Sequence, residues 1–311
     1  MTQRVVVLIA SGLLLLPSLP SGQSTTPLFS FHSNPWLSLH HFIRAVSRED
    51  LTKIEMSPGD RTVWNAGVMF YKPYGQRDVL RDNGMVTIAN ALHGADGKAS
   101  LDGVGIDADL RRTLQQVMPV YRKYWWPQHD RENREWIAAV TPLVERHGAA
   151  LSRAVARAYN TSWPSTPVAV DLTPVAGPVG GFTTVDPTHV TISSQAPDLK
   201  GYSSLELLFH ESSHAWGFRL VNGINAAAKA NGVTVPPQLW HVVLFYTAGE
   251  LTTRELKSRG INDYVMYVVN AGLYASMCGG CGDKVASAWG PYLDGKRSMN
   301  EAFTALVLAF K

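Results

Sequence analysis

The sequence contains few cysteines, has a small net charge and has few long apolar runs. It has two cysteines in 311 residues and a formal net charge of +3. A zinc ribbon needs a second pair of cysteines, so that class of site is excluded. No dense stripe of lysine and arginine accompanies the small net charge, so nucleic acid is not an expected partner. Beyond the N-terminal residues no segment is long and apolar enough to span a bilayer, so we expect no stable membrane insertion of the mature chain.

The N-terminus has the layout of a secretory signal peptide. Arg4 precedes an apolar run from Val5 to Leu16, and proline, serine and glycine follow that run. The run is short for a bilayer-spanning helix, so we interpret residues 1–24 as a signal peptide with an approximate cleavage point. An uncleaved anchor is the alternative. The sequence therefore predicts a mature chain of residues 25–311 that is secreted or periplasmic.

The two cysteines, Cys278 and Cys281, form a C-G-G-C motif late in the chain. In an oxidising compartment such a pair is expected to form a disulfide. A redox-active pair would be expected within a thioredoxin-like βαβ pattern, and no such pattern surrounds this motif. We therefore predict a small structural disulfide, with free thiols as the alternative.

The residue patterns predict an α+β fold that is mostly helical, with one small sheet. The N-terminal part, residues 30–160, is expected to contain helices at 34–46 (with Asn34 as N-cap), 107–126, 129–148 (ending at Gly148) and 149–160. In the second part, residues 161–311, short β-branched segments at 166–172 and 189–194 are separated by turn residues, which predicts two or three strands. The chain then returns to helix. Both parts are assigned to a single domain.

The helix expected directly after the sheet carries unusual polar residues. Ser203 and Glu206 match a capping box, which predicts a helix from about residue 204 to residue 217. Most of its side chains are apolar, so the helix is expected to be buried. His210, Glu211 and His214 interrupt this apolar pattern.

The spacing of these three residues is that of a metal site. His210 and His214 are four residues apart, so they project from one face of the helix and can hold one metal ion. Glu211 is rotated by about 100° from His210, which places a carboxylate beside a metal-bound water. The pattern is H-E-x-x-H, the zinc-hydrolase signature. A buried helix with hydrogen-bonded histidines is the alternative interpretation.

On these residues, and on the arrangement from about Val168 to Tyr274, the chain resembles the zincin metallopeptidases. The metzincin branch continues the motif as H-x-x-G-x-x-H; here Gly217 fits, but Leu220 stands where the last histidine is required. The gluzincin branch takes a glutamate from a second helix, and residues 236–256 resemble such a helix. The resemblance is therefore to the gluzincin branch.

The second helix offers two candidates for the third metal ligand, Glu250 and His241. They are nine residues apart, so on one straight helix they point in opposite directions and only one can reach the metal. The neighbours of Glu250 are mostly apolar, and a carboxylate in such surroundings needs a metal or a charged partner. We therefore predict Glu250 as the third ligand and keep His241 as the alternative. An ion pair between Glu250 and Arg254 is the competing interpretation, and gluzincins often carry aspartate at the position of Arg254.

The resemblance implies one Zn²⁺ per chain, held by His210, His214 and the third ligand. The metal would lower the pKa of a bound water, and Glu211 would act as general base and pass the proton to the leaving amine. A tyrosine hydroxyl would stabilise the transition state. The candidates are Tyr246, Tyr264, Tyr267 and Tyr274.

These features predict an exported zinc metallopeptidase, with a single catalytic domain, that acts on a peptide or protein substrate. By the same resemblance, the strand at residues 189–194 would present its edge to an extended peptide. The alternative is a non-catalytic exported protein with a zincin-like fold that acts as a binding or structural module. The other histidines are expected to be core or surface residues (His40 and His41) or are left unassigned (His32, His93, His129, His147 and His189).

Overall fold

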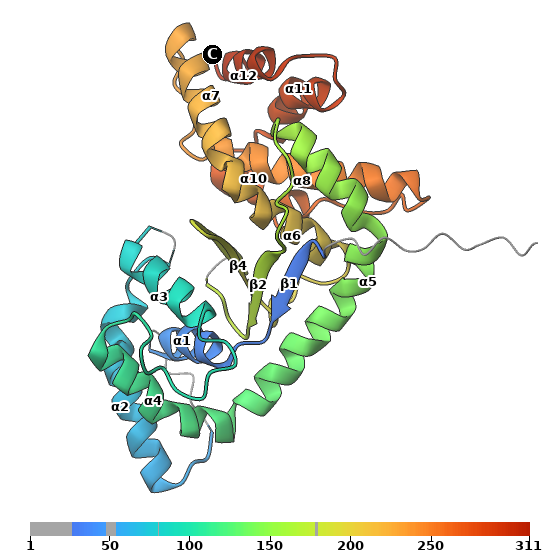
Figure 1. Ribbon diagram of the computed structural model, residues 1–311. Helices are drawn as coiled ribbons and strands as arrows, with labels where there is room; N and C mark the ends of the chain where they lie inside the picture. The colour runs from blue at the N-terminus through green and yellow to red at the C-terminus, as the bar shows by residue number, and fades with distance from the viewer. Residues whose placement is uncertain (1–26, 48–53, 80, 178–179) are drawn as a thin grey trace, which may run out of the picture.

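The computed structural model describes residues 27–47, 54–79, 81–177 and 180–311 (Figure 1). It is mostly helical and contains one four-stranded mixed sheet, so the predicted α+β class is confirmed. The predicted signal peptide, residues 1–24, lies outside the described residues. Within the described residues, no helix has both the length and the apolar character to cross a membrane.

The N-terminal part is helical, as predicted. Its helices are α1 (Pro35–Val46), α2 (Pro58–Gly75), α3 (Asn83–His93), α4 (Ala108–Tyr124) and α5 (Trp126–Ala158). The side chain of Asn34 accepts hydrogen bonds from the N–H groups of Trp36 and Leu37, which confirms the predicted N-cap of α1. The cap satisfies N–H groups that have no partner within the helix.

The long helix α5 corrects two predictions. The segments at 129–148 and 149–160 form one continuous helix instead of two, and Pro127 lies in its first turn. Gly148 does not end the helix. It is buried against the segment that contains Leu28, and a Cβ at this position would lie 2.8 Å from Leu28 Cδ1. Glycine is less favourable than alanine within a helix by about 1 kcal/mol. Tertiary packing at Gly148 therefore outweighs this cost.

The sheet contains β1 (Phe29–His32), β2 (Val168–Thr173), β3 (Gly181–Val185) and β4 (Thr188–Ser193), in the order β1-β2-β4-β3. The three strands after residue 160 agree with the prediction, and β1 was missed because four residues carry too little pattern. Strands β1, β2 and β4 are parallel, and β3 pairs antiparallel with β4. The expected substrate edge at residues 189–194 is wrong, since β4 lies inside the sheet and β3 is the outer strand.

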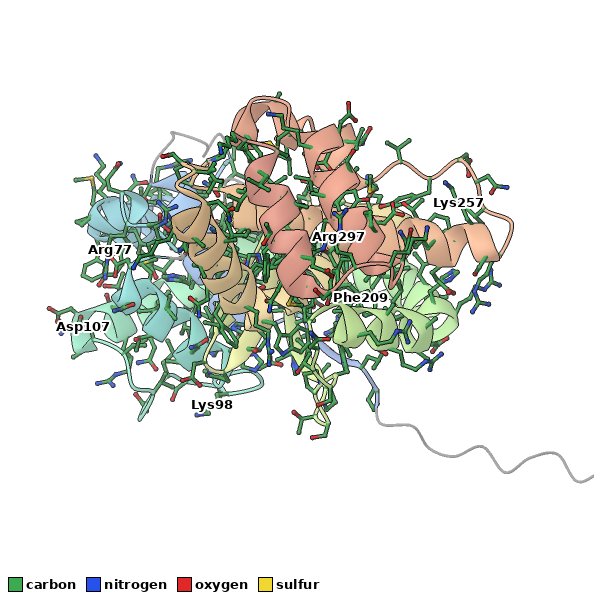
Figure 2. All side chains as sticks on the ribbon, turned by 90° about the horizontal axis from the view of Figure 1, so that it is seen from above. Arg77, Lys98, Asp107, Phe209, Lys257 and Arg297 are labelled. Carbon is green, nitrogen blue, oxygen red and sulfur yellow. A yellow bond between two sulfur atoms is a disulfide. The ribbon has the colours of Figure 1, made fainter. Side chains whose placement is uncertain are left out.

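The C-terminal part wraps one side of the sheet with helices. These are α6 (Tyr202–Ser213), α7 (Gly217–Asn231), α8 (Leu239–Ser258), α9 (Tyr267–Asn270), α10 (Leu273–Cys278), α11 (Gly282–Leu293) and α12 (Met299–Leu308). A short 3-10 turn, His214–Trp216, separates α6 from α7. Phe209 of α6 is fully buried and lies near the centre of the molecule in the view of Figure 2.

The predicted capping box of α6 is wrong. The helix begins at Tyr202 with Gly201 as N-cap and has no side-chain capping bond. Ser203, the predicted N-cap, lies within the helix, and Glu206 binds groups from a distant segment instead of the helix start. The helix also ends at Ser213, earlier than predicted.

The two faces of the sheet differ in character. Val170 of β2, Val190 and Ile192 of β4 belong to an apolar core that includes Leu205 and Phe209 of α6. The opposite face is contacted by α1 and, through His93 and Asn90, by α3, and it carries buried polar residues. Since side chains alternate along a strand, the sheet separates an apolar layer on the α6 side from a polar layer on the other.

Candidate metal centre

Helix α6 presents the two histidines of the motif at its C-terminal end. His210 lies in the last turn of α6 and is 1% exposed, while His214 is the first residue of the 3-10 turn and is partly exposed. Their rings are 5.1 Å apart and nearly perpendicular. The ring of His210 stacks on Phe245 of α8 with a centroid distance of 3.7 Å. This stacking fixes the orientation of the imidazole.

Helix α8 packs against α6 and brings His241 to the same place. The Nε2 atoms of His241 and His210 are 3.3 Å apart, and the rings of His241 and His214 are 5.0 Å apart. One ligand atom from each of the three histidines lies within 4.8 Å of the other two. Three imidazoles, from α6, the 3-10 turn after it and α8, therefore lie within reach of one another.

One of the three ligand separations has the value expected for a tetrahedral metal ion. With zinc–nitrogen bonds of about 2.0–2.1 Å and tetrahedral angles, two ligand nitrogens lie about 3.4 Å apart. The 3.3 Å between His210 Nε2 and His241 Nε2 matches that value. The same 3.3 Å contact is also within hydrogen-bond distance, so without an ion one imidazole can donate to the other, whereas His210 Nδ1 is buried and has no hydrogen-bond partner among the described residues.

The three imidazoles are held in the neutral form that metal ligation requires. Burial lowers the pKa of His210 well below its usual value, and the neighbouring imidazoles add to this shift. Burial lowers the pKa of His214 to about 3 and that of His241 to about 4. Each ring therefore has a free lone pair at neutral pH.

Glu250, the preferred third ligand in the sequence, is occupied elsewhere. Its carboxylate accepts a hydrogen bond of 2.7 Å from Arg254 Nε, and Arg254 also contacts Asp294 at 2.9 Å. Glu250 and His241 lie nine residues apart on α8, and the side of this helix that carries His241 faces His210. The geometry thus favours the alternative, because Arg254 already supplies the charge that Glu250 needs.

Glu211 is buried beside the three histidines. Thr183 of β3 donates a hydrogen bond of 2.7 Å to Glu211 Oε2, and this oxygen is 3.8 Å from His214 Nε2. Burial raises the pKa of Glu211 to about 7, while the bond from Thr183 opposes the shift. Glu211 can therefore exchange a proton near neutral pH. No pattern in the sequence indicated Thr183, because the contact joins residues 28 positions apart.

The four tyrosine candidates lie in different surroundings. Tyr264 donates to Glu206, the hydroxyl of Tyr246 is directed at Gly290 of α11, and Tyr274 packs against Gly282. Tyr267 is the only one of the four with Glu211 among the charges that raise its pKa, which burial raises to about 12. Asp198, which also hydrogen-bonds to Tyr267, contributes more to this shift than Glu211 does, so the shift does not select Tyr267 as the transition-state donor.

Glu206 anchors the segment before α9 to α6. Its carboxylate accepts hydrogen bonds from the hydroxyl of Tyr264 and from the backbone N–H of Tyr267, the latter at 3.1 Å. Glu206 is 1% exposed, and burial raises its pKa to about 7 from a usual 4.5. Since the pKa is higher in the folded chain, the stability that the protonated group provides is complete below about pH 4.5 and is lost as the pH rises through 7.

We expect Glu206→Gln to remove this pH dependence. Glutamine resembles the protonated acid, so the variant and the parent should have similar free energies of unfolding at pH 4.5. At pH 8 the variant should be more stable by up to about 3 kcal/mol. Urea unfolding of both proteins across this range measures the difference. Parallel curves would show that Glu206 does not titrate as proposed. Glu301→Gln is a control of opposite sign, because the N-cap bonds of Ser298 lower the pKa of Glu301.

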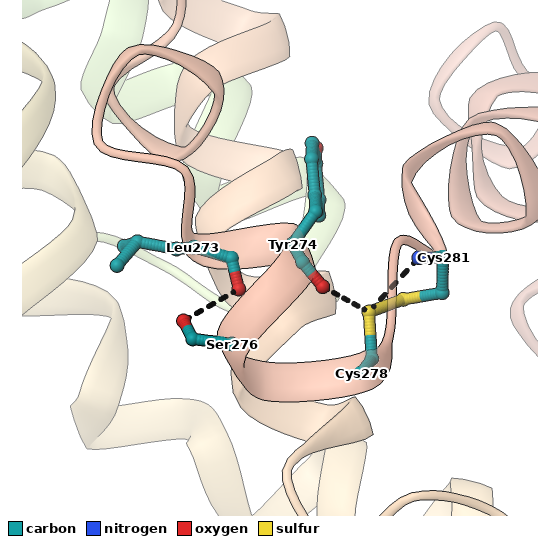
Figure 3. Close-up of a disulfide and its surroundings, with 5 residues drawn as sticks. All are labelled: Leu273, Tyr274, Ser276, Cys278 and Cys281. Atoms are coloured by element: carbon teal, nitrogen blue, oxygen red, sulfur yellow. Dashed lines mark hydrogen bonds between the residues drawn. A yellow bond between two sulfur atoms is a disulfide. The ribbon is translucent and has the colours of Figure 1, made fainter.

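The structure joins Cys278, at the end of α10, to Cys281, immediately before α11 (Figure 3). The sulfur atoms are 1.98 Å apart, and the N–H of Cys281 donates to Cys278 Sγ. Gly279 and Gly280 form the turn between them with φ values of 68° and 90°, a region that glycine adopts without strain. The pair thus closes a tight turn between two helices.

We expect the protein, isolated from its own host without reductant, to carry this disulfide in solution. Alkylation without reductant should leave the intact mass unchanged, and alkylation after reduction should add two labels. Mass spectrometry of material exported by its own host makes the measurement. Two labels without reductant would refute the prediction.

No family model, no curated protein and no solved structure matches this chain. The features that bear on function are therefore the three neighbouring imidazoles, the buried carboxylate of Glu211 and the strand β3, whose Thr183 binds this carboxylate.

Proposed function

We propose that the protein is an exported zinc-dependent peptidase whose metal is held by His210, His214 and His241. The observation that carries the proposal is the convergence of these three neutral imidazoles beside the buried carboxylate of Glu211. Three protein nitrogens leave a fourth position for solvent, which is the arrangement of catalytic zinc sites and not of closed structural ones. When bound, the metal would supply Lewis-acid chemistry and a water of lowered pKa.

Glu211 acts as the general base in this proposal. Thr183 holds Oε2, while Oε1 has no hydrogen-bond partner among the described residues and is the atom assigned to take the proton. An ideal Cβ at Gly181 would lie 3.3 Å from Oε1, so a side chain there would crowd this oxygen. Burial raises the pKa of Glu211 above its usual value, which favours acceptance of a proton by the carboxylate and its release to a leaving amine.

Strand β3 supports a peptide as the substrate. It is the outer strand of the sheet, it pairs only with β4 among the described strands, and it contacts α6. An extended peptide that added to its free edge would lie next to Thr183 and therefore next to Glu211. This edge replaces the one expected on β4.

Metal content tests the proposal. Relative to the parent, His210→Ala and His214→Ala should each lose one zinc equivalent, because two imidazoles bind far more weakly than three. Elemental analysis after dialysis gives the stoichiometry. His32→Gln is the control, since both ring nitrogens of His32 already contact Ser30 and Asp96. Zinc content equal to the parent in both alanine variants would show the motif to be accidental.

A further inference from the structure

The sheet face that lies away from α6 carries a buried polar layer. Asp171 and Thr173 of β2 and His189 and Thr191 of β4 are at most 1% exposed. Helix α1 packs on β2 at this face, α3 reaches it through His93 and Asn90, and a covered sheet face is normally apolar. Apolar packing therefore does not explain why these polar side chains are buried here.

Asp171 is the centre of this layer. Its Oδ2 lies 2.6 Å from His93 Nδ1 and 2.7 Å from His189 Nε2. The three residues come from β2, from the last position of α3 and from β4, and their ligand atoms lie within 4.8 Å of one another. They form a group of two imidazoles and one carboxylate, a donor set suited to divalent transition cations.

Several polar atoms around Asp171 have no partner. Asp171 Oδ1, His189 Nδ1, Thr173 Oγ1 and Thr191 Oγ1 are buried without a hydrogen bond among the described residues. Both ring nitrogens of His41 are also buried and unpaired, and its ring contacts Phe182 of β3 on the same face. Buried polar atoms are rarely left unpaired, so this concentration of them indicates a ligand that the protein does not itself provide.

We propose that His93, Asp171 and His189 bind a second divalent transition cation, independent of the ion at His210. The cation would neutralise a carboxylate that is completely buried. His93 is the only one of the three with appreciable exposure, 26% of its side chain, so it gives the ion a route from solvent. Because the ligands join α3 to β2 and β4, the ion has a structural role and fastens the N-terminal helices to the sheet.

The ion replaces the hydrogen bonds within the group. The distances of 2.6 and 2.7 Å are those of hydrogen bonds, and tetrahedral metal ligation requires the donors to separate to about 3.4 Å. His93 has room for this shift because it ends α3 and is partly exposed. The competing arrangement is an ion pair in which one imidazolium neutralises Asp171, and the experiment separates the two.

The test counts metal ions in four proteins, after loading with Zn²⁺ or Co²⁺ and dialysis. The parent should bind two equivalents, His93→Gln one, His214→Ala one and the double variant none. Thermal unfolding should show that adding Zn²⁺ raises the Tm of His214→Ala but not that of the double variant. His32→Gln is the matched control: its ring lies 5.3 Å from that of His93, and it should keep both ions.

Each result has one meaning. A parent that binds one equivalent, with no loss in His93→Gln, would overturn the second site and leave the ion pair as the explanation of the buried charge. A loss in His93→Gln but none in His214→Ala would support the second site and reject the proposed catalytic one. Asp171→Asn is a further check, because it keeps the shape of the side chain and removes its charge; it should also lose one equivalent.

Discussion

Glu211→Gln should remove nearly all peptide hydrolysis and leave the zinc content unchanged. Glutamine has the shape of glutamate and keeps an oxygen for the hydrogen bond from Thr183, but it cannot accept the proton. General base catalysis contributes about 10²–10⁴-fold, so kcat/KM should fall by that factor. The measurement is hydrolysis of a quenched-fluorescent peptide library, with zinc determined on the same samples.

Glu250→Gln is the matched control for this experiment. It makes the same chemical change at a carboxylate that is paired with Arg254 and lies away from the three imidazoles. It should retain both activity and zinc. Equal activity in Glu211→Gln and the parent would remove Glu211 from the mechanism. A parent that binds zinc but cleaves no member of the library would favour the alternative, a non-catalytic module with a zincin-like fold.

His241→Ala should weaken zinc binding at the catalytic site by orders of magnitude, whereas Glu250→Gln should not. The reason is geometric: His241 Nε2 is 3.3 Å from His210 Nε2, and Glu250 contacts Arg254. Loss of one of three protein ligands removes much of the binding free energy. A competition titration with a chromophoric chelator gives the affinity, and circular dichroism verifies folding.

The opposite result in the two variants would identify Glu250 as the third ligand. Weak zinc in folded Glu250→Gln with normal zinc in His241→Ala would require α8 to turn so that Arg254 releases the carboxylate. Normal zinc in both variants would point to a ligand outside this pair. Both outcomes contradict the three-histidine site.

The sequence by itself determined the features that depend on neighbours along the chain. The N-cap of α1 at Asn34 follows from a short polar residue before proline, and it was predicted correctly. The spacing of His210 and His214 is enough to place both rings on one side of a helical segment. The nine residues between His241 and Glu250 are enough to show that only one can face the metal.

Local patterns failed where distant segments take part. Glu206 was predicted to cap α6, but Tyr264 and the N–H of Tyr267 approach from about sixty positions later and bind it instead. Gly148 was predicted to end a helix, but contact with Leu28 makes glycine suitable within α5. In both places a tertiary contact replaced the local interaction that the pattern indicated.

Only the tertiary structure decided which side of α8 faces α6, and hence which residue joins the two histidines. That rotation is set by the packing of both helices in a shared core, and periodicity along one helix does not contain it. The same holds for His93, Asp171 and His189, which are far apart in sequence and meet only because α3 covers the sheet. Spacing within an element is fixed by its helical or strand period, whereas contacts between elements depend on how all of their side chains pack together.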